Sequence, residues 1–363
     1  MKYIHGGDIY AVQKQRDHNE QILDFSANIN PLGLPESVKN AVIRGVEQCI
    51  HYPDPFCREL KKAISEEEHV PEDQLIIGNG AADVIFRLTE ALHPKKAMIP
   101  APTFAEYEAA LTEYGCSVRY HFLKEETGFL LDDTIVEEID ESLDLLFLCN
   151  PNNPTGQLIP RDLLHRILKR CGQTNTVLVL DECFIDLTEE PSGYTMRPWI
   201  GEYPNLFIIK AFTKSYAMPG LRLGYGICSD TALIDDLWGT GQPWSVSVPA
   251  QLAGMSAIRE TDYLERSRRL IRQEKEKLFT GLSQLGMNVL PPASNFVFFR
   301  IPEGMEIDLK EQLETRGILI RSCANYPGLG KNHYRVAVRT PEENQKLLSS
   351  LNDILKHRKK GGA

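Results

Sequence analysis

Segment 210–225 of this 363-residue chain contains a lysine and an arginine whose spacing suits covalent chemistry on an anionic molecule. Lys214 follows an apolar, strand-like run at residues 206–209, so its ammonium group is expected at a buried strand end. Because burial disfavours the charged form, the pKa of this lysine should fall, and the neutral amine can attack a carbonyl to form a Schiff base. Thr213 and Arg222 flank the same turn and could share one anion. An exposed loop lysine beside an arginine on the next strand explains this segment equally well.

A Schiff-base lysine beside a phosphate clamp matches pyridoxal 5'-phosphate, because this cofactor carries both an aldehyde and a phosphate. Asn153 lies in the Asn/Pro/Gly-rich segment 150–156, which follows one predicted strand, and Asp181 ends the next predicted strand. Side chains at the carboxyl ends of parallel strands meet in one crevice. Asp181 could keep a pyridine nitrogen protonated there, since an ion pair at ~4 Å is worth roughly 4 kcal/mol at an effective dielectric near 20. Segment 150–156 by itself predicts only a turn.

Three further features could complete such a site. A glycine loop at residues 78–83 stands between a predicted strand and a predicted helix, where free amide groups favour a phosphate. A plain strand-to-helix turn is the commoner explanation. Phe104 follows another predicted strand and could lie flat on a cofactor ring or belong to the core. Arg321 and Arg335 stand at predicted strand ends and would suit a substrate with two anions, unless they are solvated surface arginines.

An α/β fold must position these residues. Short apolar runs alternate with helical patterns, which predicts a mainly parallel central sheet flanked by helices on both faces. The predicted strands are residues 75–77, 97–99, 117–121, 144–148, 177–180, 206–209 and 223–227, and the predicted helices are residues 36–48, 57–68, 82–92, 105–113, 131–139 and 160–170.

A long, charged helical stretch is predicted over about residues 248–285, and a different pattern follows it. Strand-like runs at residues 295–300, 318–320 and 334–338 then alternate with helical patterns at 309–316 and 341–356, which is typical of an α+β module. We therefore predict a large cofactor-binding domain over residues 36–260, a smaller α+β domain over residues 261–363, and an N-terminal arm, residues 1–35, that joins the smaller domain.

Composition narrows the classes of function. A net charge of −10 without a stripe of Lys and Arg argues against nucleic-acid binding. No apolar stretch approaches the length of a membrane span, and residues 1–17 lack the apolar core of a secretion signal. The eight cysteines show no C-x-x-C pair and the nine histidines no metal-ligand spacing. We therefore expect a cytoplasmic protein with reduced thiols, no metal site and no membrane partner.

Taken in order, these motifs resemble those of the fold-type I pyridoxal-phosphate enzymes in the aspartate and histidinol-phosphate aminotransferase superfamily. The matching motifs are N-P-T-G at 153–156, D-E-C-F at 181–184 and T-K-S-Y-A-M-P-G-L-R-L-G-Y at 213–225. Within that superfamily the chain is more similar to the threonine-phosphate decarboxylases of the cobalamin pathway. Four segments carry this closer similarity: H-G-G at 5–7, L-D-F-S-A-N-I-N-P-L-G at 23–33, Q-P-W-S-V at 242–246 and I-R-S-C-A-N-Y-P-G-L at 320–329.

The resemblance, which extends from about residue 5 to residue 351, implies a role for each matching residue. Lys214 would form the Schiff base, Asp181 would pair with the pyridine nitrogen, Asn153 would donate to the ring hydroxyl and Phe104 would stack on the ring. The cofactor phosphate would be bound by Gly80, Ala81, Ala82, Thr213, Arg222 and, in a homodimer with shared active sites, the partner subunit's Tyr52. The substrate carboxylate would contact Asn28 and Arg335, and the substrate phosphate Arg321, with His5 and Gly6 as further candidates.

The activity that the resemblance implies is decarboxylation of L-threonine O-3-phosphate to (R)-1-aminopropan-2-yl phosphate and CO2. Two positions depart from the aminotransferase pattern. Phe184 replaces a tyrosine that donates to the ring oxygen, which modestly disfavours transamination, and Ala211 replaces a phosphate-binding serine. A histidinol-phosphate-type aminotransferase is the main alternative. A regulator that binds pyridoxal phosphate without catalysis is a third, which the retained Lys214, Asp181 and Arg335 disfavour.

Overall fold

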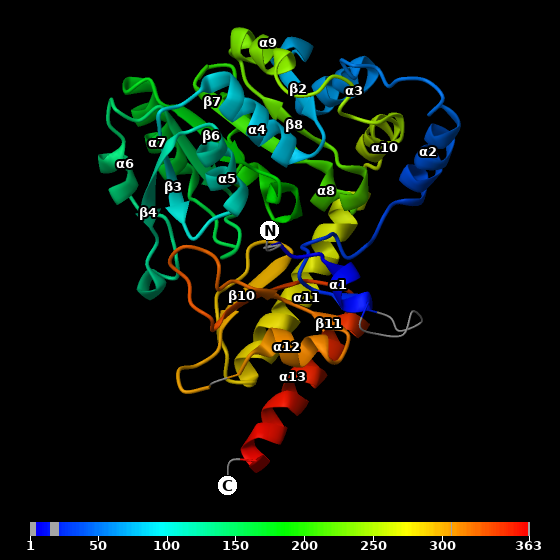
Figure 1. Ribbon diagram of the computed structural model, residues 1–363, viewed down its shortest axis with the longest axis vertical. Coiled ribbons are helices and arrows are strands. Elements are labelled where there is room, and N and C mark those ends of the chain that lie inside the picture. The colour runs from blue at the N-terminus through cyan, green and yellow to red at the C-terminus, as the bar shows by residue number, and fades with distance from the viewer. Residues whose placement is uncertain (1–4, 15–21, 306, 362–363) are drawn as a thin grey trace.

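The computed structural model describes residues 5–14, 22–305 and 307–361, with side chains described as far as residue 356. In Figure 1 a large sheet with its helices forms the upper part of the molecule. A smaller group of strands and helices lies below it, and the N-terminal segment lies where the two parts meet.

In the described part of the chain, the larger sheet has seven strands in the order β2-β8-β7-β6-β5-β3-β4. All neighbouring pairs are parallel except those of β8, which is antiparallel to both β2 and β7. The mainly parallel sheet predicted from the sequence is therefore confirmed. The strands are β2 (Leu75–Gly78), β3 (Lys96–Ala101), β4 (Ser117–Phe122), β5 (Leu145–Cys149), β6 (Val177–Asp181), β7 (Leu206–Ala211) and β8 (Gly224–Ile227).

Both faces of this sheet are buried. Along β5, Leu146 and Leu148 belong to one hydrophobic cluster, whereas Leu145 and Phe147 belong to another on the opposite face. This alternation follows from the two-residue repeat of a strand. Because both faces are covered, side chains that contact a ligand can lie only at the strand ends. The helices of this part are α2 (Glu36–Glu47), α3 (Arg58–Glu68), α4 (Ala81–Leu92), α5 (Ala105–Glu113), α6 (Thr134–Glu138), α7 (Arg161–Gln173), α8 (Phe212–Ser215), α9 (Thr231–Gly239) and α10 (Val248–Ile258).

The helical stretch predicted over residues 248–285 consists of two helices. Helix α10 ends at Ile258, and α11 (Tyr263–Gln284) begins after a short turn. The small buried residues of α10, such as Ala253 and Ala257, pack it against α2 and α3 in the large part. Helix α11 packs mainly against β9, β10 and α13 in the smaller part and also contacts the turn Ile185–Leu187 of the large part. One straight helix could not serve both surfaces, so the chain bends where it passes between them.

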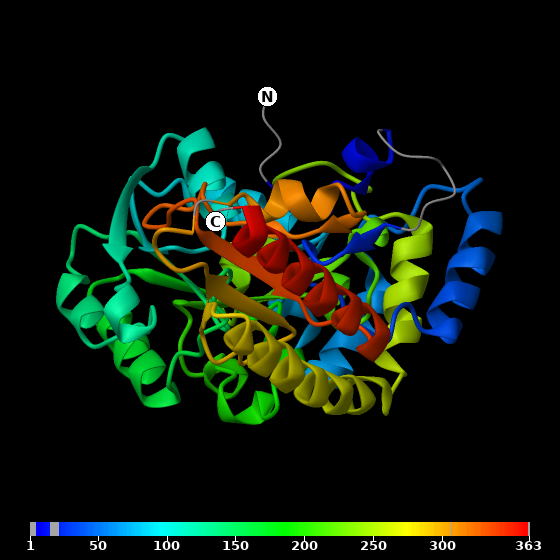
Figure 2. The ribbon, with the colours of Figure 1, turned by 90° about the horizontal axis from the view of Figure 1, so that it is seen from below.

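The smaller part is built on a four-stranded antiparallel sheet in the order β12-β13-β10-β9. Figure 2 shows α11 and α13 side by side beneath this sheet, and the two helices are in contact. A shared hydrophobic cluster that includes Leu278, Phe299 and Leu351 holds the sheet and helices together. The elements are β9 (Asn288–Val289), β10 (Phe296–Arg300), α12 (Leu309–Glu314), β11 (Ile318–Leu319), β12 (Arg321–Ser322), β13 (His333–Ala337) and α13 (Pro341–Gly361).

The N-terminal segment is attached to this smaller part. It contains α1 (Ile9–Gln13) and β1 (Leu23–Asp24), and β1 pairs in parallel with β11. Phe25 extends the contact, because its carbonyl accepts a hydrogen bond of 2.8 Å from the amide of Ala337. The predicted limits of the arm and the two domains stay a prediction.

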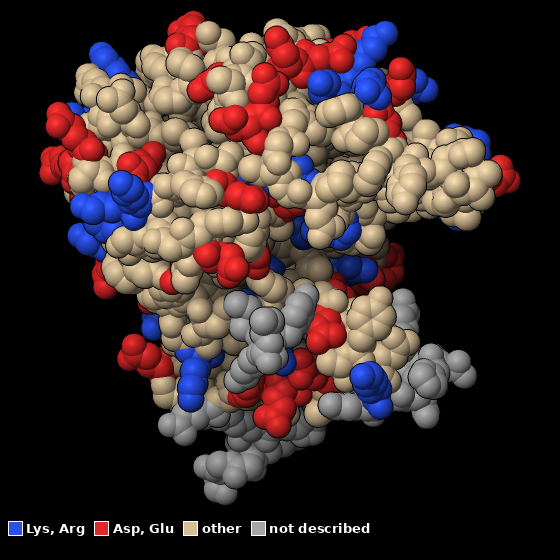
Figure 3. Space-filling model, turned by 45° about the horizontal axis from the view of Figure 1, so that its top comes forward, with Lys and Arg blue, Asp and Glu red and all other residues tan. Residues whose placement is uncertain are grey.

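On the face in Figure 3, Lys and Arg side chains are scattered among Asp and Glu rather than gathered into one basic area. Among the described helices, none combines the length and apolar character that crossing a membrane would require.

Candidate active site

A cavity of about 230 Å³ lies at the carboxyl ends of β5, β6 and β7, where it is bordered by the N-terminal segment and the smaller sheet. All of the predicted site residues line it except Gly80 and Tyr52. Segments more than 300 residues apart in the sequence, such as those that hold His5 and Arg335, therefore contribute to one space.

Lys214 lies in the single turn of α8, which begins as soon as β7 ends. The N-terminal segment holds this turn in place: the Asn30 amide donates to the Lys214 carbonyl at 3.3 Å, and Asn30 Nδ2 donates to the Ser215 carbonyl at 2.8 Å. Burial, together with the charges of Arg335 and Arg222, lowers the pKa of Lys214 to about 8. A useful fraction of the amine is therefore neutral and nucleophilic near neutral pH, as the sequence predicted.

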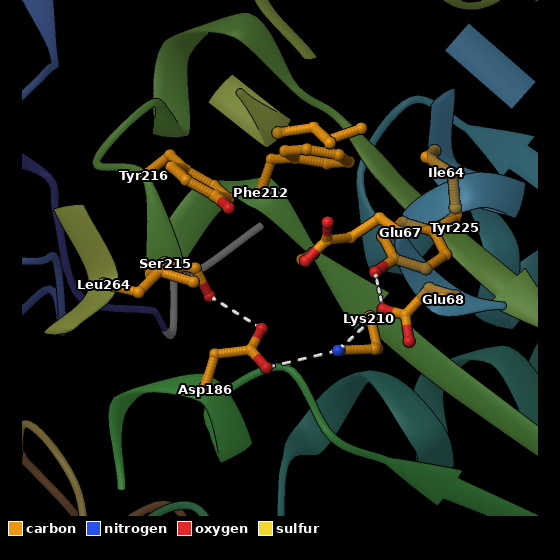
Figure 4. Close-up of a pocket in the computed structure, with 12 residues that line it drawn as sticks. Ile64, Glu67, Glu68, Asp186, Lys210, Phe212, Ser215, Tyr216, Tyr225 and Leu264 are labelled. Carbon is orange, nitrogen blue, oxygen red and sulfur yellow. Dashed lines mark hydrogen bonds and ion pairs between the residues drawn. The ribbon is translucent and has the colours of Figure 1, made fainter. Parts of the chain in front are cut away.

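A second lysine nearby has the opposite character. Figure 4 shows Lys210 of β7 in a small polar pocket, between Glu68 at 2.8 Å and Asp186 at 3.2 Å. Burial alone would lower the pKa of Lys210, but the two carboxylates outweigh it and raise that pKa well above its ordinary value. Tyr225 completes the group by donating from its hydroxyl to Glu68 at 2.5 Å. Lys210 therefore stays protonated and cannot act as a nucleophile.

Asp181 ends β6 and is buried with two hydrogen-bond donors. Its Oδ2 accepts from the Tyr107 hydroxyl at 2.6 Å, and its Oδ1 accepts from the Cys183 amide at 2.9 Å. Burial raises the pKa of Asp181, whereas these donors and the nearby Lys214 favour its anionic form. A carboxylate in these surroundings gains from a cationic partner, and a protonated ring nitrogen would provide one.

Asn153 and Arg335 meet across the boundary between the two sheets. One guanidinium nitrogen of Arg335 donates to Asn153 Oδ1, and another donates to the Ser26 carbonyl at 2.7 Å. Since Oδ1 accepts from Arg335, the NH2 group is the part of the Asn153 amide that can serve as a donor to a bound molecule. Arg335 Nε and both amide atoms of buried Asn28 have no hydrogen-bond partner among the described residues. Buried polar atoms of this kind are expected where a ligand binds.

Arg321 and His5 border another side of the same cavity. The Arg321 guanidinium lies 5.2 Å from the centre of the Tyr326 ring and donates to Asn325 Oδ1 at 2.8 Å. His5 Nε2 lies 2.7 Å from the Glu106 carboxylate. Besides Arg222, the cavity therefore contains two further guanidinium groups, which belong to Arg335 and Arg321.

The glycine loop after β2 forms a close cradle with Arg222. Gly80 has a φ of +87°, and a Cβ at this position would lie 2.6 Å from Arg222 Nη2, so only glycine fits. Helix α4 begins at the next residue, which directs free amide groups of its first turn, including those of Ala81 and Ala82, to the same place. With buried Thr213 beside it, this arrangement suits a phosphate group.

Tyr52 does not lie in the cavity of its own subunit. Its side chain is 80% exposed, and its ring lies 4.8 Å from the ring of Trp244. Its predicted contact with a partner subunit's cofactor stays a prediction, as do the roles of the other site residues.

Residues 20–351, most of the chain, match the family model for aminotransferase class I and II. The chain belongs to this family. The threonine-phosphate decarboxylase of Salmonella typhimurium (strain LT2) is 42% identical over 97% of this chain and 96% of that protein. The adenosylcobalamin biosynthesis bifunctional protein CobDQ of Leptospira interrogans is 35% identical over 98% of this chain but only 42% of its own length. The resemblance drawn from the sequence motifs is thus confirmed.

Solved structures also support membership of the aminotransferase class I and II family. The histidinol-phosphate aminotransferase from Clostridium acetobutylicum superposes with a TM-score of 0.86 at 32% identity, covering 93% of this chain and 100% of that chain. The L-threonine-O-3-phosphate decarboxylase from Porphyromonas gingivalis gives 0.81 at 26% identity, covering 92% and 100%. The predicted fold-type I architecture is therefore confirmed.

In this class I and II family member, both departures from the aminotransferase pattern, Phe184 and Ala211, line the cavity. Phe184 packs edge-on against Phe296, with ring centres 5.1 Å apart. Because phenylalanine has no hydroxyl, this position cannot donate a hydrogen bond to a ligand. The cavity also contains residues that the sequence analysis did not single out: Ser26, Ala27, Cys149, Cys183 and Tyr326.

Among the described residues, no group of three or more His, Cys, Asp or Glu side chains is arranged to hold a metal ion.

Proposed function

We propose that this protein removes CO2 from L-threonine O-3-phosphate with the help of pyridoxal 5'-phosphate and releases (R)-1-aminopropan-2-yl phosphate. The observation that carries the proposal is the pair of guanidiniums, Arg335 and Arg321, that face the same cavity as the low-pKa amine of Lys214. A substrate with a carboxylate and a phosphate offers one anion to each guanidinium, and its amine would replace the Lys214 amine on the cofactor aldehyde. The 42% identity to a threonine-phosphate decarboxylase supports this assignment.

The residues present fit the cofactor. Lys214 would hold its aldehyde carbon, Asp181 its ring nitrogen and Asn153 its ring hydroxyl. The cradle of Gly80, Ala81, Ala82, Thr213 and Arg222 would hold its phosphate. Pyridoxal 5'-phosphate, when bound, supplies a conjugated ring that accepts the electron pair of whichever Cα bond stands perpendicular to it.

Choosing which bond breaks is then a matter of orientation by the protein. Arg335 would hold the substrate carboxylate, with the unpartnered Asn28 amide as its second contact. Arg321 would hold the substrate phosphate, and two anchors together fix the rotation about the N–Cα bond. When CO2 leaves, Cα must gain a proton. Lys214, whose pKa of about 8 lets it both hold and release a proton near neutral pH, is suited to supply it.

The homodimer belongs to the same proposal. Exposed apolar side chains gather on and after α2, on the mostly uncharged projection at the right of Figure 3, whose place matches α2 in Figure 1. They include Ile43 at 56% exposure, Val46 at 61%, Ile50 at 83% and Tyr52 at 80%. A patch of this kind marks a protein interface, and burial against a second copy would bring Tyr52 close to the other subunit's cofactor phosphate.

The biological setting that we propose is assembly of the cobalamin nucleotide loop, which is supported by the name of the Leptospira relative.

The decisive experiment is incubation of the purified protein and cofactor with threonine phosphate. Release of one CO2 per amine product supports decarboxylation. Amine exchange that depends on an added 2-oxo acid, without CO2, would instead support a histidinol-phosphate-type aminotransferase, the alternative suggested by the 32% identity to the Clostridium enzyme. If neither reaction occurs, the remaining interpretation is a protein that binds the cofactor without catalysis.

A further inference from the structure

We propose that Tyr107 is a positioning residue that keeps Asp181 anionic and correctly placed for the ring nitrogen of the cofactor. This inference rests on the proposed function, since it assumes that pyridoxal 5'-phosphate occupies the cavity. Tyr107 itself does not line the cavity. It acts from behind, through Asp181 and through the predicted ring-stacking residue Phe104.

The contact with Asp181 is short and buried. The Tyr107 hydroxyl donates to Asp181 Oδ2 at 2.6 Å, and both side chains are almost completely shielded from solvent. The Cys183 amide donates to the other oxygen at 2.9 Å, and the Cys183 thiol also interacts with this carboxylate. Each carboxylate oxygen therefore has a backbone or hydroxyl donor, and these donors set the plane of the carboxylate.

The direction of the hydrogen bond is also determined. Burial raises the pKa of Tyr107 well above its ordinary value, and the neighbouring Asp181 charge adds to the effect. The phenol therefore keeps its proton and donates it to Asp181, and this hydrogen bond opposes the rise that burial causes in the pKa of Asp181. A buried carboxylate without this donor would take up a proton more readily and lose the charge that a pyridinium nitrogen needs.

The ring of Tyr107 is fixed by its neighbours. It stacks on Phe147 with ring centres 4.8 Å apart and planes at 6°. It meets Phe104 edge-on, with ring centres 5.6 Å apart and planes at 81°. Phe104 caps α5 and Tyr107 lies three residues later in its first turn, so the two side chains project from the same face of the helix. One residue thus supports both the stacking ring and the carboxylate.

The test is cofactor binding by the full-length protein after removal and stepwise return of the cofactor. Tyr107→Phe keeps the ring packing and removes only the hydroxyl. We expect it to weaken binding of pyridoxal 5'-phosphate roughly 10- to 100-fold, the range expected for one hydrogen bond to a charged group. An analogue with carbon in place of the ring nitrogen should lose less than about threefold, because it cannot engage Asp181 in either protein.

A matched control is Tyr114→Phe at the end of the same helix, where the hydroxyl donates to Glu90 at 3.2 Å, away from the cavity. It should leave binding of both compounds unchanged. A double-mutant cycle gives an independent check: in an Asp181→Asn background, Tyr107→Phe should cost almost nothing.

Three outcomes would overturn the inference: an unchanged affinity of Tyr107→Phe for pyridoxal 5'-phosphate, an equal loss with both compounds, or additive losses in the cycle. If the unaltered protein fails to take up the cofactor at all, the proposed function itself is overturned instead.

Discussion

Lys210 and Lys214 stand four residues apart on one strand and its following turn, yet their surroundings give them opposite chemistry. Lys210 is held between Glu68 and Asp186 and keeps its proton. Lys214 faces the cavity, and the positive charges of Arg335 and Arg222 join burial in lowering its pKa to about 8. Neighbouring charges, rather than residue type, decide which amine can attack a carbonyl.

The first prediction follows from this contrast. Lys214→Ala should abolish covalent attachment of the cofactor and lower the rate of CO2 release by at least about a thousandfold, because the covalent nucleophile is gone. Peptide mapping after borohydride reduction of the unaltered protein checks the assignment directly. The reduced cofactor should be found attached to the side chain of Lys214 and not to that of Lys210. A label on Lys210 would contradict the assignment.

The second prediction concerns Arg321. Its removal should lower kcat as well as raise KM, because binding energy from the substrate phosphate is used to orient the reacting bond. We expect Arg321→Ala to lower kcat at least about tenfold and to raise the yield of pyridoxamine phosphate per CO2 released. Arg316→Ala, which removes an exposed arginine just before β11, is the control. A change in KM alone, with the product ratio unaltered, would show that the phosphate anchor does not select the bond.

At this scale, the candidate site could be predicted from the sequence where a residue stands in a motif at a strand end, as do Asp181 and Lys214. Tyr107 could not be found in this way, because a buried tyrosine on a helix is usually a core residue. The only available signal was its spacing of three from Phe104, which predicts a shared helix face but names no partner. The Asp181 contact depends on β6 and α5 meeting in space.

At the scale of elements, Glu68 connects three of them. It ends α3 and receives Lys210 from β7 and the Tyr225 hydroxyl from β8, so one carboxylate joins a covering helix to two strands. These are also the strands on either side of the Lys214 turn. The pocket in Figure 4 therefore stabilises the base from which α8 begins.

The third prediction is that Glu68→Gln lowers the free energy of unfolding by about 3 kcal/mol, because it removes one partner of a buried ion pair. Glu67→Gln, at the exposed neighbouring position, should change it by less than about 0.5 kcal/mol. Both values would be measured by urea unfolding. Equal effects of the two substitutions would contradict a role for the ion pair.

The pH dependence gives a further check of this third prediction. Burial alone would raise the pKa of Glu68, but Lys210 outweighs it and the pKa lies below its ordinary value of 4.5. The stability from this carboxylate is therefore fully present above pH 4.5 and is lost as the pH falls through the lowered pKa. The difference between Glu68→Gln and the unaltered protein should shrink over that acidic range.

Strands that are buried in one sheet could be predicted from the sequence. The bend between two consecutive helices that pack on different parts of the molecule could not. Strand β5 is a continuous apolar run, and β7 is apolar over residues 206–209, because parallel strands are buried on both faces. Helices α10 and α11 both show helical patterns, and the turn between them at residues 259–262 contains no proline or glycine that would mark it in the sequence. The bend arises because the two helices pack on different parts of the molecule.

For the molecule as a whole, the exposed apolar patch on α2 and the position of Tyr52 outside its own cavity support the same dimer. A shared active site can be tested by mixing defective subunits, since a residue that acts across an interface can be supplied by either copy.

The fourth prediction is therefore that a mixture of Lys214→Ala and Tyr52→Ala subunits, unfolded and refolded together, regains activity. Half of the dimers would be mixed, and each mixed dimer would have one intact site, so about a quarter of the sites should work. Activity and sedimentation of the mixture, compared with each variant refolded alone, provide the measurement. No gain over the sum of the separate variants would place Tyr52 outside the partner's site.

The pairing of β1 with β11 joins segments about 300 residues apart, and this separation has a consequence during synthesis. The ribosome releases the segment that holds Asn28 and Asn30 long before it makes the strands on which that segment lies. All seven strands of the large sheet emerge in the meantime and can fold first, because domains generally fold as units. A nascent chain would then have its cofactor cradle before it has Arg321 or Arg335. It should be able to bind pyridoxal 5'-phosphate while its synthesis is still incomplete, but it could bind a substrate only after β13 has been made.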